Sequence, residues 1–533
     1  MALISTCGRA LREFIGKRSV FLTVFIILIL NLLLKNILGV NENVVLAEAR
    51  HFGDPSWIPN DWFLNQYIGY RLLFNAIFGQ LAMILPLYLV SIAGRLVIYF
   101  LFAIVIEKIS RTLKIHLALI IPALVLFVSF QSIVAREWMI GGVETKSFAY
   151  ICALGALVAL AHRRYRPMFL LTGLAASFHI LVGIYAAFSL GVAILLTFNS
   201  HSDRIKEIFL AVPYALMTAV PAIYAVGQYL YDSASVDALK AATIYVIERN
   251  PHHTFPEAWT RPWVARFSAS CMLFAGILAF SRRPARRVFA AYGLGSAVLF
   301  CAGLVLYHSG NYAWLKLYWF RHPDVIIPLL GFFLLAALMS EPLKSESAPG
   351  TERKTIINKP ALQKTALVIA LLLSTAGMVK SAYVFSRHIV KIAGSERPFY
   401  LAHLEPNLRE ALLWIKGNTP ADAMFLVSPA IDEFYISAER AMFVSFKHSP
   451  QTDSDNIEWY NRILLLNNGK IPAKRGFKMV REIDQSFYDL ETATINEIAK
   501  RYSLDYYLGK SERKRPYRIA YDNDNYTLYR LRQ

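Results

Sequence analysis

The feature that most constrains this chain is a series of eleven apolar runs, most of them near the length that crosses a bilayer. The runs lie at 19–34, 79–107, 115–134, 147–162, 167–181, 183–199, 207–229, 263–281, 288–307, 324–340 and 365–385. A transmembrane helix needs about 20 apolar residues to cross roughly 30 Å of hydrocarbon. The pattern predicts an α-helical polytopic membrane protein with about eleven transmembrane helices, and it excludes a disordered chain or a soluble single domain.

Three of these runs allow more than one interpretation. The first could be a signal peptide, but it exceeds the ~7–15 apolar residues of a signal sequence and Ala47–Ala49 lies too far beyond it to be the cleavage site, so we predict a retained anchor. Residues 167–199 would form a helix of about 50 Å, too long for one crossing, which favours two spans that break near His179–Gly183. The run 79–107 contains Pro86 and Arg95, and part of it could lie along the outer surface.

Lysine and arginine are distributed unevenly between the runs. The loops 40–78, 135–146, 230–262 and 308–323 carry nine of them, whereas the mostly shorter segments that alternate with these loops carry twenty-one. Cytoplasmic loops are enriched in these residues, so we predict a cytoplasmic N-terminus and place these four loops and residues 386–533 outside the cytoplasm. The basic excess lies in the apolar half, with 34 basic and 18 acidic residues in 1–385. This favours membrane topology over nucleic-acid binding, and we predict the bilayer, and no nucleic acid, as a partner.

The pattern changes after residue 386, so we divide the chain into a transmembrane domain (1–385) and an extracytoplasmic domain (386–533). An amphipathic helix is predicted at 406–417, further helices at 456–466 and 495–502, and short strands at 424–427, 442–446, 506–508, 517–521 and 526–531. Asn523–Asp524 suits a hairpin turn. The tail therefore reads as a small α/β domain, and it contains no glycine-rich phosphate loop.

The four outer loops combine acids, bases and aromatics, and they supply the candidate site residues. Carboxylates beside a membrane surface can gain basicity by partial desolvation and serve as general bases, while several cations near a bilayer suit a lipid-linked phosphate. The candidate bases are Asp54 and Asp61. The candidate substrate- or phosphate-binding residues are Glu48, Arg50, His51, Arg136, Glu144, Lys146, Arg249, His252, His253, Lys316, Arg321 and His322. The intramembrane His179 joins them, and Arg95 is a second polar residue inside an apolar run.

Each of these features has a plainer alternative. The acids could be solvated loop residues, the cations could anchor anionic headgroups, and His179 could face outer water at a helix break. The His252–His253 pair is a weak metal signal, because adjacent side chains point in different directions.

The overall pattern resembles the GT-C superfamily of integral membrane glycosyltransferases, in particular its poorly characterised bacterial branches. The acidic first loop (DPSWIPND), the eleven predicted crossings and the tail string WIKGNTPADAMFLVSPAIDEFYISAERAMFVSFKHSP carry the resemblance, together with GGVETKSFAY and ASFHILVGIY. The chain lacks a WWDYG-like motif and an Asp-Glu pair in the first loop, and Asp54 and Asp61 stand apart instead.

The resemblance implies an inverting transfer of a sugar from a polyprenyl-phosphate carrier to an extracytoplasmic acceptor, which could be a glycan, a lipid or a protein. Asp54, ahead of Asp61, would deprotonate the acceptor, and Arg249, His252 and Arg321 would stabilise the departing phosphate. It also implies a bacterial cytoplasmic (inner) membrane. Some members use a divalent cation such as Mg²⁺ or Mn²⁺ and others use none, so no metal ligand is assigned.

Other classes of protein remain open from the residues. A lipid or polysaccharide transporter would show internal repeats and broken spans at matching positions, and no convincing repeat is present. An O-antigen polymerase or ligase would share much of the pattern. A membrane-anchored sensor would need far fewer spans.

Overall fold

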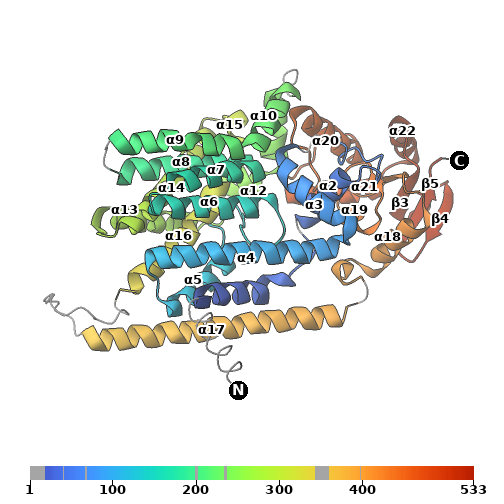
Figure 1. The fold of residues 1–533 in the computed structure, drawn as a ribbon. Helices are drawn as coiled ribbons and strands as arrows, with labels where there is room; N and C mark the ends of the chain where they lie inside the picture. Colours follow the sequence, from blue (N-terminus) through green and yellow to red (C-terminus); the bar gives the residue numbers. More distant parts are fainter. Residues whose placement is uncertain are drawn as a thin grey trace.

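The computed structural model describes residues 18–39, 41–66, 69–198, 202–232, 237–341, 359–395 and 398–532 (Figure 1). The predicted fold class is confirmed in outline: a helical bundle is followed by a small C-terminal domain with a sheet. In Figure 1 the long helices of the bundle run side by side along the molecule, and the C-terminal domain sits at one end of them.

The first half of the bundle begins with an N-terminal helix, Arg18–Leu33, whose last turn is the π-helix η1 (Ile29–Leu33). It is followed by α2 (Glu42–Gly53), η2 (Gly69–Arg71), α3 (Leu72–Ile84), α4 (Leu87–Leu113), α5 (Leu117–Ser129), α6 (Thr145–Ala161), α7 (Tyr165–Phe178), α8 (Ile180–Thr197) and α9 (Ser202–Thr218).

The second half comprises α10 (Val220–Asp232), α11 (Ala238–Thr243), η3 (Ile244–Arg249), α12 (Pro251–Thr254), η4 (Pro256–Ala258), α13 (Trp263–Phe280), α14 (Pro284–His308), α15 (Tyr312–Leu315), α16 (Arg321–Met339) and α17 (Lys359–Ala393). α17 continues past the predicted domain boundary at residue 385.

Every predicted apolar run contains helix, but the count of eleven crossings is not confirmed. Within the described residues, six helices are long and apolar enough to cross a membrane: α4, α8, α13, α14, α16 and the Leu367–Ala393 part of α17. Counting α9 and α10, which form a pair bent by 65°, gives seven. The N-terminal helix, α5 and α6 are apolar but shorter, and a 13-residue helix such as α5 is only about 20 Å long. Helices of this length and composition are typical of an integral membrane protein. The number of full-length spans is smaller than predicted.

The predicted break near His179 is confirmed. His179 ends α7 and caps α8, where its Nδ1 accepts a hydrogen bond from the Val182 amide at 3.4 Å. Gly183 follows, and a Cβ there would collide with the backbone of Ala176. A glycine at this position therefore lets the two helices approach closely just beyond the break.

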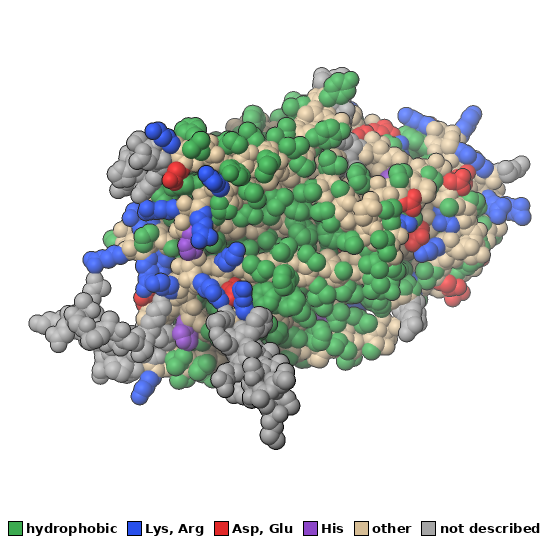
Figure 2. All heavy atoms as spheres, in the orientation of Figure 1, with side chains coloured by type: hydrophobic (Ala, Val, Ile, Leu, Met, Phe, Trp, Pro, Cys, Tyr) green, Lys and Arg blue, Asp and Glu red, His purple; other side chains and the backbone are tan. Residues whose placement is uncertain are grey.

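The surface of the bundle follows the pattern of a protein embedded in lipid. Only 11% of the apolar window of α13 and 22% of that of α17 is buried, and α17 lies along one edge of the bundle against α5 and η1. Figure 2 shows a broad apolar surface across the middle, with lysines and arginines gathered at the end opposite the C-terminal domain, and with basic and acidic side chains mixed on the C-terminal domain itself.

The C-terminal domain is built around one mixed sheet of five strands in the order β2-β1-β3-β5-β4. The strands are β1 (Met424–Leu426), β2 (Ala441–Met442), β3 (Tyr506–Lys510), β4 (Arg518–Asp522) and β5 (Tyr526–Arg530). β1 pairs in parallel with β2 and β3, and β5 pairs in antiparallel fashion with β3 and β4. The accompanying helices are η5 (Phe399–Leu401), α18 (Pro406–Asn418), α19 (Phe434–Ser437), α20 (Asp453–Leu466), α21 (Phe477–Tyr488) and α22 (Thr492–Tyr502).

The predicted elements of this domain are largely present. The hairpin turn between β4 and β5 is confirmed, with the Asn523 side chain accepting from the amides of Asn525 and Tyr526. The strand predicted at 442–446 is wrong in extent, since β2 ends at Met442. α19 and α21 were not predicted.

The first long loop (40–78) is folded, because α2 and the turns after it pack between the helical bundle and the C-terminal domain. Val44, Ala47, Ile58, Phe63 and Leu64 share an apolar core with strands and helices of the C-terminal domain. Removing this surface from water stabilises the contact between the bundle and this domain.

A buried ion pair fixes the start of this connection. Glu42 and Arg95 are both almost fully buried, and the carboxylate accepts from Arg95 Nε at 2.7 Å and Nη2 at 2.6 Å. The same carboxylate accepts from Ser91 and from the amides of Leu38 and Val143. The Arg95 guanidinium also donates to the carbonyls of residues 32, 33, 35 and 36, at the end of the N-terminal helix. Arg95 therefore ties helices together, and α4 continues through it.

We expect Arg95→Met to destabilise the protein strongly, because it would leave the Glu42 carboxylate buried without a cation. Breaking a buried pair in this way typically costs about 3–5 kcal/mol. The melting temperature in detergent measures the effect. The double variant Glu42→Gln/Arg95→Met should lose less than the single variant, and a single variant that melts like the wild type would contradict this role.

Candidate functional site

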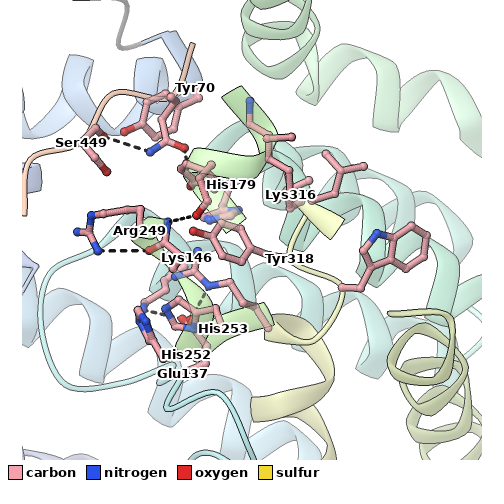
Figure 3. A pocket seen from close by; sticks show the side chains of 18 of the residues that line it. Tyr70, Glu137, Lys146, His179, Arg249, His252, His253, Lys316, Tyr318 and Ser449 are labelled. Atoms are coloured by element: carbon pink, nitrogen blue, oxygen red, sulfur yellow. Dashed lines mark hydrogen bonds and ion pairs between the residues drawn. The ribbon is translucent and has the colours of Figure 1, made fainter. Parts of the chain in front are cut away.

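A large cavity of about 1640 Å³ lies where the predicted outer loops meet the C-terminal domain. All four predicted outer loops contribute to its wall, as do residues 447–453 and 473–478 of the C-terminal domain. Figure 3 shows side chains from these separate segments gathered around it. Residues of all four predicted outer loops therefore meet at one cavity, but Asp54 and Asp61 of the first loop do not line it.

The cavity has a charged part and an apolar part. Nine lysines and arginines line it against five aspartates and glutamates, so its formal charge is positive. Another part of the wall comes from α8, α10 and α15, where Ile184, Leu230 and Trp314 line the cavity and are each more than half exposed on the protein surface. A ligand with a charged head and an apolar tail matches such a wall.

At the centre of the charged part, Glu137 is held between two cations. Lys146 Nζ lies 2.6 Å from Glu137 Oε1, and Arg321 Nε lies 2.6 Å from Glu137 Oε2. Lys146 also contacts Glu144 at 3.2 Å and lies over the Trp138 ring. Burial alone would raise the pKa of Glu137, but Arg321 and Lys146 outweigh burial and lower it. Glu137 is therefore ionised and fixes both cations.

The loop that presents Glu137 is anchored by a carboxylate that sequence reasoning missed. Asp324 in the first turn of α16 is fully buried, and it accepts from the Ser132 hydroxyl and from four amides, those of residues 133, 134, 135 and 137, at 2.6–3.1 Å. Arg321, one turn earlier, binds the Glu137 side chain. One turn of helix thus holds both the backbone of the loop and its charged side chain.

Two further ion pairs line the cavity. Glu48 of α2 pairs with Arg71, and burial raises the pKa of Glu48 despite that arginine. Lys316 pairs with Asp453 of the C-terminal domain and donates to the Tyr229 hydroxyl at 3.1 Å. The second pair crosses between the two halves of the protein.

Among the residues that the structure describes, Arg249, His252 and His253 form a group in which no side chain makes an ion pair with a carboxylate. Arg249 closes the π-helix η3, and the two imidazoles follow in α12 with ring centres 4.1 Å apart. The Nε of Arg249 and the Nδ1 atoms of both histidines are buried and make no hydrogen bond. Burial, and then the charge of Arg249, lowers the pKa of His252 to about 3, so this imidazole is neutral near pH 7. The group offers unused hydrogen-bonding atoms to a ligand.

The structure brings together most of the predicted binding residues. The cavity is lined by Glu48, Arg136, Glu144, Lys146, His179, Arg249, His252, His253, Lys316 and Arg321. His322 lines a small hollow behind it that shares Glu137, Lys146 and Arg321. Sequence reasoning missed Tyr70, Arg71, Glu137, Tyr245, Tyr318, Lys447, Gln451 and Asp453, which also line the cavity.

Besides His322, four predicted residues lie outside the cavity, including both predicted bases. Asp54 follows α2, pairs with Arg50 at 3.2 Å and accepts from Ser56. Arg50 also donates to the Ala82 carbonyl, and His51 bridges Trp57 and Asn65. These contacts stabilise the conformation of the first loop, and the three side chains do not line the cavity.

Asp61 has a structural environment. It is fully buried and accepts from the amides of Leu64 and Met442, at 2.9 and 3.0 Å, and from the Tyr435 hydroxyl at 2.9 Å. It therefore binds the first loop to strand β2 of the C-terminal domain. Burial raises the pKa of Asp61 to about 6, against these hydrogen bonds.

Metal ligands are not grouped in the part of the chain that the structure describes. No three histidine, cysteine, aspartate or glutamate side chains are arranged there to hold an ion.

Comparison with known proteins adds one match. A domain of unknown function, DUF6798, matches residues 406–466, which run from α18 through α20. No curated protein matches the chain. The matched segment contains Lys447, Gln451 and Asp453 of the cavity wall.

We expect Asp61→Asn to lower the free energy of unfolding by about 1–3 kcal/mol, because an amide offers one acceptor to three donors. The pH dependence should also change. A carboxyl whose pKa is raised on folding contributes its full stability below its unfolded pKa of about 3.9, and this contribution is lost as the pH rises through about 6. Melting temperatures between pH 4 and 7 test both effects. The surface variant Asp54→Asn serves as the control, and an Asp61→Asn protein with wild-type stability would refute the role.

Proposed function

We propose that this protein is a glycosyltransferase that moves a sugar from a polyprenyl-phosphate carrier to an acceptor outside the cytoplasm. The observation that carries the proposal is the two-part cavity, whose cationic interior adjoins an apolar wall formed by α8, α10 and α15. A lipid-linked phosphate has an anionic head that needs charge-assisted hydrogen bonds and a tail that must remain in an apolar medium. The predicted GT-C resemblance supports the same conclusion.

The orientation is part of the proposal. Basic side chains gather at the end of the bundle opposite the C-terminal domain (Figure 2), and the positive-inside rule favours that end for the cytoplasm. The cavity and the C-terminal domain would then face the outside of a bacterial cytoplasmic membrane. The acceptor would reach the cavity from water and the donor from the lipid.

We assign the general base to Glu48 in place of Asp54. Glu48 comes from the predicted first loop, lines the cavity and has a raised pKa, which suits a group that must accept a proton near neutral pH. In the step proposed, Glu48 takes the acceptor hydroxyl proton as the acceptor oxygen bonds to the anomeric carbon. The bond from that carbon to the phosphate oxygen breaks, and the phosphate leaves with the electron pair. The sugar is transferred with inversion.

The cations of the cavity would stabilise the departing phosphate. Arg321 and Lys146 are held in place by Glu137, and Arg249 has free hydrogen-bonding capacity. Preorganised donors of this kind stabilise a developing charge without reorganising during the reaction.

A polymerase or ligase of lipid-linked glycans is the second candidate, because the same two-part cavity would bind its donor. The two activities differ in whether one sugar or a whole glycan is transferred. A transporter is less favoured, since the ionisable side chains of the cavity lie beside the C-terminal domain at one end of the bundle and not near the middle of the helices. Analysis of the lipid-linked sugars that accumulate in a deletion strain separates these activities.

We expect Glu48→Gln to reduce sugar transfer by at least about 10²-fold, the usual contribution of a general base. Asp54→Asn is the matched control in the same loop and should transfer at close to the wild-type rate. Complementation of the deletion strain, with donor accumulation as the readout, measures both, and melting temperatures verify folding. Because the pKa of Glu48 is raised, the wild-type kcat/KM should fall on the acid side at a pH above the ordinary ~4.3 of a glutamate. An active Glu48→Gln protein would reject the assignment.

A further inference from the structure

We propose that Arg249 and Lys447 form a binding site for a phosphoryl group that is shared between the bundle and the C-terminal domain. The site assigns a ligand-binding role to the segment that matches DUF6798, which supplies Lys447. The existence of the site is independent of the glycosyltransferase activity. Only the identification of its natural ligand as the lipid-linked donor rests on the proposed function.

The first argument is that Arg249 is buried with its hydrogen-bonding capacity largely unused. The residue is 4% exposed, its Nε has no hydrogen-bond partner, and its two contacts to Asn250 Oδ1 and the Lys447 carbonyl are long, at 3.4 and 3.3 Å. The guanidinium lies over Phe446 and Phe477, with 4.5 and 5.2 Å to the ring centres. These rings orient the planar donor fork but provide no negative charge.

The second argument is the absence of a carboxylate. Lys447 Nζ lies 5.2 Å from the centre of the Phe477 ring, and within the described ranges neither Lys447 nor Arg249 has an acid at ion-pair distance. The cavity cations Arg71, Lys146, Lys316 and Arg321 differ, because each pairs with a glutamate or an aspartate. Arg136 and Lys478 of the same wall also make no ion pair within the described ranges, but they are exposed to solvent, whereas Arg249 is buried and Lys447 is half-buried.

The electrostatic consequence is visible in both cations. Burial lowers the pKa of Arg249, and burial together with the charge of Arg249 lowers the pKa of Lys447 to about 8. Asp432 attracts both from a distance, but burial and the neighbouring Glu433 raise its own pKa. Two close cations with weak compensation are unfavourable in a low-dielectric site, and an oxyanion between them would remove that cost.

The third argument is access. Both residues line the large cavity, and Arg136, His252 and Lys478 lie in the same wall. Figure 3 shows Arg249 beside the cavity, with His252 and His253 next to it. An arginine fork and a lysine point charge are the groups that proteins use for phosphate oxygens. A phosphoryl group entering the cavity therefore reaches both cations.

The test uses the full-length protein in detergent and inorganic pyrophosphate as the probe. Lys447→Met keeps the side-chain length and removes the charge, and Lys470→Met is the control on the exposed surface of the same domain. We expect pyrophosphate to raise the melting temperature of the wild type and of Lys470→Met. Its affinity for Lys447→Met should be at least about tenfold weaker, as expected for loss of a charge-assisted contact.

A second readout separates binding from general damage. Because Lys447→Met removes a positive charge that acts on the buried Arg249, we expect the variant without ligand to melt no lower than the wild type. The conservative Arg249→Lys variant keeps the charge but loses the fork, so it should bind pyrophosphate with intermediate affinity. If Lys447→Met and the wild type bind pyrophosphate equally, the proposed site is wrong.

Two arms identify the source of the phosphoryl group. The affinity of the wild-type protein for pyrophosphate is measured in nanodiscs with and without a polyprenyl monophosphate. If the site binds the head of the lipid-linked donor, the polyprenyl monophosphate competes with pyrophosphate, and the apparent affinity for pyrophosphate is lower in the nanodiscs that contain it. Equal pyrophosphate affinity in both kinds of nanodisc assigns the site to a free phosphate. If the deletion strain accumulates no lipid-linked sugar and the wild-type protein transfers none, while Lys447→Met has lost its affinity for pyrophosphate, the site stands and the proposed function fails. If the wild-type protein transfers sugar and Lys447→Met binds pyrophosphate as tightly as the wild type, the site alone fails.

Discussion

The architecture depends on the burial of the Glu42 carboxylate against Arg95. Glu42 begins α2, immediately after the N-terminal helix, and it is bonded to α4 through Arg95 and Ser91 and to the loop before α6 through the Val143 amide. An ionised pair removed from water is tolerated only when its remaining donors and acceptors are satisfied. The carbonyls at the end of the N-terminal helix complete that requirement for Arg95. The buried ion pair therefore holds in place α2 and the loop before α6, which both contribute residues to the wall of the cavity.

Buried carboxylates repeat this arrangement at two other places. Asp324 accepts hydrogen bonds from four amides of the loop that carries Glu137, and Asp61 of the first loop accepts one from the Met442 amide of β2. In each case a single side chain satisfies backbone donors that a buried irregular loop cannot pair by itself. Irregular backbone at a membrane boundary needs such partners, because lipid offers none. The cavity can thus be built from loops and still hold its side chains in defined positions.

Hydropathy and charge were sufficient to predict the helical bundle, the break at His179 and most elements of the tail, because each depends on local pattern. They were insufficient for the number of full crossings, since helices such as α5 end sooner than their apolar runs. The roles of Asp54 and Asp61 also escaped prediction. A loop carboxylate looks the same in a sequence whether it faces a cavity or accepts amides from a distant strand. Lys447 and Asp453 could not be found, because only the fold brings the C-terminal domain to the cavity.

The distribution of charge in the cavity suggests a division of labour among its residues. Glu137 has a lowered pKa because two cations hold it, whereas burial raises the pKa of Glu48. Carboxylates whose environments move their pKa values in opposite directions suit different roles: Glu137 remains a permanent anchor, and Glu48 is able to exchange a proton. The cations divide in the same way. Arg321 and Lys146 are already paired with Glu137, whereas Arg249 and Lys447 have no carboxylate at ion-pair distance within the described residues. In the proposed phosphoryl site these two cations supply the unpaired positive charge, and the C-terminal domain takes part in binding through Lys447.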